Sequence, residues 1–289
     1  MADARPSTLK AALPLLSPAT LMVVALLLGP LALLARFSLN RFDPTAIMVA
    51  ALTAANYGRF FSDPFYRNVL VTTVRVSAIV TALCLAVGIP MAWRLARSNN
   101  RYKSVWLTLL VLPLFIGAVT RTAGWMILFA RGGMLDLALG RLFNAPPVDL
   151  MFSEGAVIAG IVSINLPFTI LALQSTFEGI DPRLEEAAAG MGASPARAFG
   201  RVVFPLALPG VLIAAVLCFI LCMNAFATPV LLGGPRFHMM APLVYWEFTN
   251  NNNWPFAAAL ALILMTTTLA LAGLANLAVP ERYRIGRRG

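Results

Sequence analysis

Residue types that carry enzyme chemistry are scarce in this sequence, and their spacing matches no catalytic site. The chain has one histidine, His238, and three cysteines, of which Cys218 and Cys222 stand four positions apart. A zinc site needs more ligands than these, so we interpret the cysteines as small buried apolar residues. The patterns HExxH, GxSxG and GxxxxGK[ST] do not occur. The sequence therefore predicts no catalytic residue, no metal site and no enzymatic activity of the chain itself.

A second set of residues has the chemistry to contact a polar solute, because it lies inside long apolar stretches. Arg75 and Arg121 are the charges in these stretches, and a charge at such depth normally faces a cavity or a partner. Pro113, Pro167 and Pro229 each leave a backbone carbonyl without its helical partner. Polar side chains near these prolines either meet a solute or bond neighbouring helices. The candidates for a solute path are Arg75, Arg121, Trp125, Asn165, Asn224 and Thr228.

Only membrane-spanning helices can hold these side chains in place. Of 289 residues, 60% are hydrophobic and 12% are charged, and a soluble domain carries about twice that charged fraction. The apolar runs are hydrophobic all round, which favours helices over alternating barrel strands. We therefore expect an all-α polytopic membrane protein with one transmembrane domain over residues 1–289. Its six predicted transmembrane helices cover residues 13–35, 68–93, 105–129, 155–177, 206–232 and 255–277.

The distribution of basic residues predicts the orientation of the chain. Its formal charge is +10, but the 22 Lys and Arg lie in short clusters between apolar runs, unlike a nucleic-acid-binding face. Thirteen of them fall on the side of both termini, seven on the opposite side and two within predicted spans. Because basic loops remain in the cytoplasm, we expect both termini to be cytoplasmic.

The loop at residues 178–205, which we name the coupling loop, has the sequence of two short helices joined by a tight turn. Asp181 suits an N-cap and Pro182 the first helical position. Gly192 suits the left-handed position that ends a helix. Ser194 suits the N-cap of a second helix with Pro195 at its first position, and Pro205 and Pro209 are expected to end that helix. This pattern alone is compatible with a docking element and with a simple amphipathic connector.

The coupling loop resembles the EAA motif of ABC importer permeases, which has Glu, two Ala, a Gly four residues beyond the second Ala, and a later apolar-x-apolar-Pro. The matching residues are Glu186, Ala187, Ala188, Gly192, Val202, Phe204 and Pro205. The family usually has Ile and Leu at the positions of Val202 and Phe204. The resemblance implies that this loop docks into a cytoplasmic ATPase subunit and transmits its closure. The residues implied in coupling are Glu185, Glu186, Ala187, Ala188, Gly192 and Ser194.

The same resemblance implies the partners and the location of the chain. It would act with cytoplasmic ATPase subunits, two in number, and with a second permease subunit that is identical or homologous. A periplasmic solute-binding protein would deliver the solute, and the bacterial inner membrane would hold the complex. The chain itself would need no cofactor, because the ATPase subunits bind the ATP.

Three further stretches resemble the spermidine/putrescine-type branch of these permeases. They are Arg67–Arg97, Leu112–Phe129 with an RTxxWM core, and the pair Phe226–Pro235 and Tyr245–Leu262. With the coupling loop they cover most of the chain from residue 67 onward. The first 66 residues carry little beyond a span.

Two departures from this branch leave the charge of the solute open. Members often carry an acid just before Phe226, where this sequence has Asn224 and Ala225. They also often carry an acid before the Trp-Pro pair at Trp254, where this sequence has Asn253. A polyamine should meet carboxylates or aromatic faces along its path. All twelve Asp and Glu, however, fall in predicted tails or loops, outside the predicted spans. One hypothesis is therefore that the solute is a polyamine. The other is that the solute is an amino or organic acid whose carboxylate contacts the two arginines. A secondary transporter and an intramembrane enzyme are the alternatives to an ABC permease.

Overall fold

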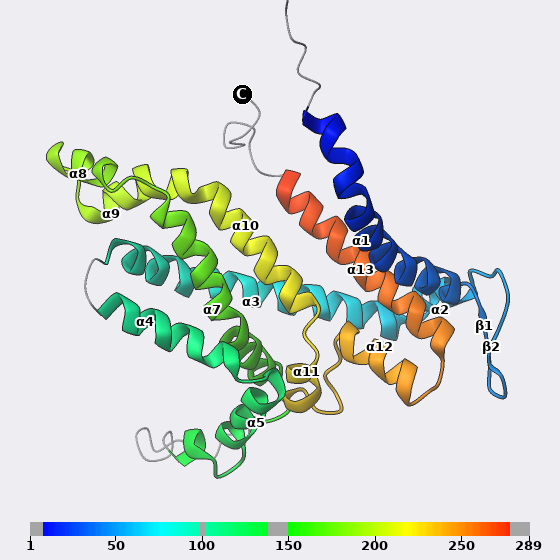
Figure 1. Ribbon diagram of the computed structural model, residues 1–289. Coiled ribbons are helices and arrows are strands. Elements are labelled where there is room, and N and C mark those ends of the chain that lie inside the picture. Colours follow the sequence, from blue (N-terminus) through cyan, green and yellow to red (C-terminus); the bar gives the residue numbers. More distant parts are fainter. Residues whose placement is uncertain (1–7, 99–101, 138–149, 278–289) are drawn as a thin grey trace, which may run out of the picture. The chain divides into compact units, whose positions relative to one another are not determined.

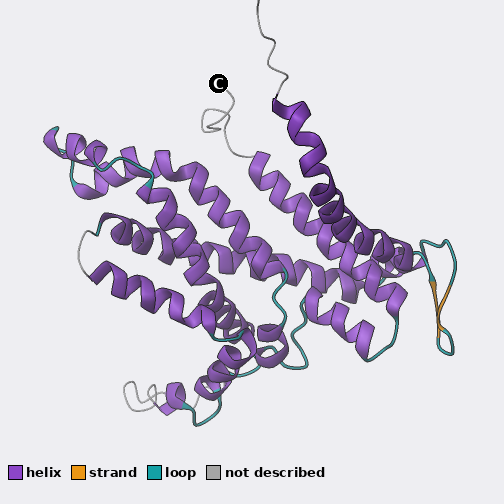
Figure 2. Cartoon of the chain, viewed as in Figure 1, coloured by secondary structure: helices purple, strands orange, loops and turns teal. Residues whose placement is uncertain are grey.

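The structure is a computed structural model that describes residues 8–98, 102–137 and 150–277. Helices dominate the described residues (Figures 1 and 2), so the predicted all-α class is confirmed. The chain divides into two compact units. The first contains the residues up to Pro64 together with Val244–Ile263, and the second contains Phe65–Leu243 together with the residues from Leu264 onward.

The first unit adds small elements that the sequence analysis missed. Helix α1, Thr8–Ser38, leads into a hairpin of β1, Arg41–Asp43, and β2, Ile47–Val49, which is followed by α2, Ala55–Ser62. The buried Asn56 side chain donates to the carbonyls of Ser38 (2.7 Å) and Asn40 (2.9 Å), which ties α2 to the end of α1. Strands of three residues are too short to produce a detectable alternation of polar and apolar residues.

The second unit holds the elements that concern function. They are α3 (Pro64–Arg97), α4 (Tyr102–Val111), the 3-10 turn η1 (Leu112–Phe115), α5 (Ala118–Phe129), α7 (Glu154–Glu178), α8 (Arg183–Gly190), α9 (Pro195–Ala198), the π-helical turn η2 (Phe199–Val203), α10 (Phe204–Met223) and α11 (Ala227–Leu232). Two further helices, α12 (Met240–Thr249) and α13 (Trp254–Leu277), have residues in both units.

The number of apolar helices agrees with a polytopic membrane protein. Within the described residues, five helices are long and apolar enough to cross a bilayer, or six if one bent pair counts as a single span. Helix α3 has 34 residues, a length of about 51 Å at 1.5 Å per residue. It therefore extends beyond a hydrocarbon core of about 30 Å.

The predicted third and fifth spans are wrong as continuous helices. Residues 105–129 are split between α4 and α5, and the two arms are bent by 97°. Pro113 cannot donate a backbone hydrogen bond, and Ile116 and Gly117 have extended backbone. Residues 206–232 are split between α10 and α11, because α10 ends at Met223. Hydropathy does not detect either break, since the residues on both sides are apolar.

Pro205 and Pro209 do not end a helix, contrary to the prediction from the sequence. Helix α9, η2 and α10 run on without interruption from Pro195 to Met223. Pro205 lies in the first turn of α10 and Pro209 lies inside it. The wider π-helical turn at Phe199–Val203 accommodates the missing N–H and the ring of Pro205.

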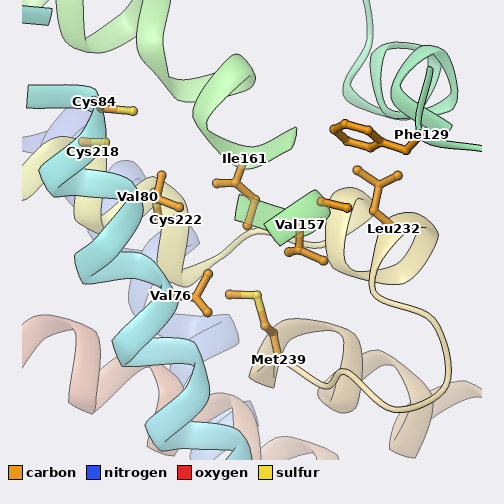
Figure 3. Close-up of a cluster of buried hydrophobic side chains, with 11 residues drawn as sticks. Val76, Val80, Cys84, Phe129, Val157, Ile161, Cys218, Cys222, Leu232 and Met239 are labelled. Atoms are coloured by element: carbon orange, nitrogen blue, oxygen red, sulfur yellow. The ribbon is translucent and has the colours of Figure 1, made fainter. Parts of the chain in front are cut away.

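The core of the second unit lies among α3, α7, α10 and α11. Figure 3 shows its buried side chains, among them Val76 and Ile161, directed toward one another. Cys84, Cys218 and Cys222 lie in this cluster as free thiols and are at most 1% exposed. The interpretation of the cysteines as buried apolar residues is therefore confirmed.

Candidate functional site

Helices α7 and α10 are the two stems of the coupling loop, and they meet closely beside it. An ideal Cβ built on Gly210 of α10 would lie 2.2 Å from Cγ2 and 2.8 Å from Cβ of Thr176 on α7. Only glycine permits this approach. Thr176 is two residues from the end of α7, so the contact sets the spacing of the stems near the loop.

The turn between α8 and α9 is a Schellman motif, and its geometry explains Gly192. The Gly192 N–H donates to the Ala189 carbonyl (2.9 Å), and the Ala193 N–H donates to the Ala188 carbonyl (3.0 Å). Gly192 has φ = +85°, a left-handed conformation that costs any residue with a Cβ. Figure 1 shows α8 and α9 beside each other at the ends of α7 and α10.

The start of α8 and the start of α9 are capped differently. The Asp181 carboxylate accepts from the Arg183 backbone N–H (2.9 Å), but Pro182 occupies the N-cap position of α8, so the helix begins one residue later than predicted. Ser194 occupies the N-cap position of α9, but its side chain makes no capping hydrogen bond. Its carbonyl accepts from the Ala198 N–H (2.9 Å) instead.

The coupling loop has one face packed inward and one face exposed. Ala188 is buried, and Glu186 and Ala187 are exposed. Met191, at the tip of the turn, is 83% exposed, and Leu184 is 43% exposed. The loop therefore presents a carboxylate, a small residue and two apolar side chains on an accessible surface.

Ion pairs join the coupling loop to the ends of α3 and α4. The Arg97 guanidinium donates to Glu185 (Nε to Oε1, 2.7 Å) and to the Phe177 carbonyl (3.1 Å). Lys103 pairs with Glu178 at 2.8 Å. Sequence reasoning selected Glu185 but missed Arg97, because 88 positions separate them and only the packing of α3 against the loop brings them together.

Three of the predicted path residues bond neighbouring helices instead of facing a cavity. The Asn165 amide donates to Cys222 Sγ (3.2 Å) on α10. The Thr228 hydroxyl lies 3.2 Å from the Thr122 hydroxyl, which joins α11 to α5. The Trp125 indole donates to the Ser163 hydroxyl (2.8 Å) on α7. Of the two roles that the sequence left open, these contacts favour interhelical bonding.

Arg75 has an acidic partner that the sequence did not predict. Its Nη2 lies 2.7 Å from Oε2 of Glu154, and both side chains are more than one third exposed. Glu154 is the first residue of α7, where the N-cap Ser153 accepts from the Ala156 N–H. Glu154 lies one residue before the predicted start of this span, and the sequence did not reveal its contact with Arg75 because 79 positions separate the two residues.

Arg121 lies just after the break between η1 and α5. Its Nη2 donates to the Ile116 carbonyl at 3.4 Å. Its Nε and Nη1 are buried and have no hydrogen-bond partner among the described residues. Asn224, at the other break, is exposed, and the Ile220 carbonyl accepts from both its side-chain amide (2.9 Å) and its backbone N–H (3.3 Å).

Comparison with known proteins identifies the family of this chain. Residues 147–282, which include the coupling loop and its stems, match the family described as binding-protein-dependent transport system inner membrane component. The spermidine/putrescine transport system permease protein PotB of Escherichia coli K12 is 33% identical over 225 residues, which cover 77% of this chain and 81% of PotB. The chain belongs to this permease family.

Further relatives agree with this assignment. The molybdenum transport system permease protein ModB of Mycobacterium bovis is 30% identical over 243 residues, which cover 83% of this chain and 89% of ModB. One chain of a bacterial alginate ABC transporter, solved with its alginate-bound periplasmic protein, has a TM-score of 0.79 at 15% identity and covers 94% of this permease and 95% of that chain. The latter likeness shows a shared fold.

The permease is therefore a subunit of a binding-protein-dependent ABC importer in the spermidine/putrescine-type branch, as the motifs indicated. Glu247 on α12 is 4% exposed, and its Oε2 accepts from the Asn251 amide (3.0 Å). The sequence analysis placed it in an outer loop, because α12 is too short to register as a span.

Proposed function

We propose that this permease forms part of the path of a polyamine-type cation. Two cytoplasmic ATPase subunits would dock on the coupling loop and power transport by moving it. The ATPase subunits would bind the ATP, and the permease would need no cofactor. A second permease subunit and a periplasmic solute-binding protein would complete the importer. The observation that carries the coupling role is the rigid turn at Gly192 with Met191 exposed at its tip.

The geometry of the loop supports transmission of movement. An ATPase groove that held Met191 and Leu184 would cover apolar surface that the chain leaves exposed. The Arg97–Glu185 pair would pass a displacement of α8 to α3. The close contact of Gly210 with Thr176 would keep both stems moving together.

Substitution of the turn glycine tests this role. Gly192→Ala places a Cβ at φ = +85°, which costs about 1–2 kcal/mol and should distort the turn. Gly190→Ala is the matched control, since its Cβ would meet nothing within 4 Å. We expect solute-stimulated ATP hydrolysis by the reconstituted importer to fall in Gly192→Ala and in Glu186→Lys, and to stay normal in Gly190→Ala. Normal stimulation in both loop variants would refute a docking role.

The structure and the relatives together favour a cationic solute. An anionic solute would be favoured by two arginines within spans that have no acid beside them. Glu154 neutralises Arg75, and Glu247 adds a buried carboxylate. PotB, which is 33% identical to this permease, is named as a spermidine/putrescine permease. Uptake by the assembled importer should then be inhibited by micromolar spermidine.

A solute with a carboxylate or similar anionic group is the second candidate, and Arg121 favours it. Two of its guanidinium nitrogens lack a protein partner among the described residues, and a molybdenum permease is among the relatives. Under this hypothesis Arg121→Gln slows uptake without abolishing assembly, and organic or amino acids compete while spermidine does not. Strong competition by spermidine with normal transport by Arg121→Gln would exclude it.

Orientation follows from the same proposal. Both termini and the coupling loop would face the cytoplasm of a bacterium, because the basic residues concentrate on that side. Reporter fusions after residues 100, 190 and 289 should report cytoplasm, and fusions after residues 140 and 240 should report the outer side. A cytoplasmic result at residue 140 would contradict this topology.

A further inference from the structure

We propose that a groove between α3, α4 and α7 binds one anionic phospholipid, with its head group on Arg94 and an acyl chain in the groove. The groove has a volume of about 550 Å³. Its apolar wall includes Met91 and Leu95 of α3, Trp106 and Leu110 of α4, and the buried Ile170 of α7. Nothing in this site takes part in the coupling contacts described above.

The lining of the groove determines the kind of ligand. Most of its wall is apolar, and Arg94 and Ser98 stand at the end of α3. A complementary molecule needs a long apolar part and a polar head. Since α3 is longer than the hydrocarbon core is thick, Arg94, three residues from its end, reaches the level of the lipid head groups.

The charge of the head group follows from the pairing of nearby basic residues. The structure describes three of them at this end of α3 and α4. Arg97 pairs with Glu185 and Lys103 pairs with Glu178. Arg94 is exposed and has no acidic partner among the described residues. It is therefore the cation at the groove that can bind a phosphate of an anionic lipid.

The size of the expected preference is modest and measurable. One basic residue near an anionic head group contributes about 1 kcal/mol, which corresponds to roughly fivefold tighter binding of an anionic lipid than of a zwitterionic one. A basic position between transmembrane helices at the membrane surface is a known type of lipid-binding site.

Trp106 provides a local reporter, because bromine on an acyl chain quenches the fluorescence of a nearby indole. The full-length permease, in the assembled importer, would be placed in nanodiscs that contain brominated phosphatidylglycerol or brominated phosphatidylcholine, each over the same series of mole fractions. The chain has five tryptophans, so the quenching lost in Trp106→Phe isolates the contribution of the groove. Phosphatidylglycerol should quench this contribution at roughly fivefold lower mole fraction than phosphatidylcholine.

Two arginine variants of the same helix separate the proposal from its alternatives. Arg94→Gln should reduce the preference for phosphatidylglycerol to less than about twofold, because it removes the charge that accounts for the roughly fivefold preference. Arg67→Gln, at the opposite end of α3 and also exposed, should leave the preference unchanged. Equal quenching by both lipids in the unsubstituted protein would overturn the proposal, as would a preference that survives Arg94→Gln. Absence of any Trp106-dependent quenching would show that no acyl chain occupies the groove and would also overturn the proposal.

Discussion

Gly210→Ala should separate the stems of the coupling loop, and its effect can be estimated from the structure. The new Cβ would lie 2.2 Å from Cγ2, 2.3 Å from Oγ1 and 2.8 Å from Cβ of Thr176. Rotation of the Thr176 side chain cannot relieve the clash, because its Cβ is itself too close. The two helices must instead move apart by about 1 Å to restore ordinary carbon–carbon distances.

A matched glycine isolates the energetic cost of this contact. Gly273→Ala on α13 makes the same change at a helical position where the Cβ would meet nothing within 4 Å. Both variants gain about 0.5–1 kcal/mol in helix propensity, so this gain cancels in the comparison. Overpacking costs about 1–3 kcal/mol, and Gly210→Ala should be less stable than Gly273→Ala by that amount.

Thermal unfolding of the purified permease in detergent measures the difference. At about 2–4 °C per kcal/mol for a chain of this size, the midpoint of Gly210→Ala should lie roughly 2–12 °C below that of Gly273→Ala. Thr176→Ala, added to Gly210→Ala, removes the two nearest atoms and should restore part of the loss. Solute-stimulated ATP hydrolysis should fall in Gly210→Ala and recover in the double variant.

Equal midpoints for the two alanine variants would contradict the predicted clash, as would a loss of stability that Thr176→Ala leaves unchanged. The first result would mean that α7 and α10 are not in close contact at Gly210. The second would mean that the cost arises elsewhere in α10.

Other predictions use the same measurements. Glu185→Gln removes the charge from the half-buried pair with Arg97, so the unfolding free energy should drop by about 1–3 kcal/mol, and unaltered ATPase stimulation would argue against this pair as a link to α3. Arg75→Gln should change stability by less than about 1 kcal/mol, because the pair with Glu154 is exposed; if uptake falls in this variant but returns in the double variant with Glu154→Gln, Arg75 serves the ion pair rather than the solute. Gly160→Ala should cost less than Gly210→Ala in the thermal assay, since its Cβ would meet the movable ends of α11 side chains at 2.6 and 2.8 Å; a larger cost would show that the Thr228 and Leu232 side chains cannot move aside, and no cost would contradict the packing of α11 on α7.

Locally encoded features of this permease were predictable from its sequence. Long apolar runs placed the helices, because transfer of apolar surface to lipid depends on composition alone. The coupling loop was recognised from Gly192 and its neighbours, because a positive φ is a property of one residue. The family followed from the same short stretch.

Contacts between distant segments, in contrast, were decided by the tertiary structure. Arg97 meets Glu185 and Arg75 meets Glu154 only because particular helices are neighbours, and no pattern along the chain records that choice. The breaks at Gly117 and Asn224 were hidden by apolar residues on both sides. Hydropathy measures how strongly each residue prefers lipid to water. The position of a helix break or an ion pair depends instead on which backbone and side-chain polar groups still need a partner after the helices have packed.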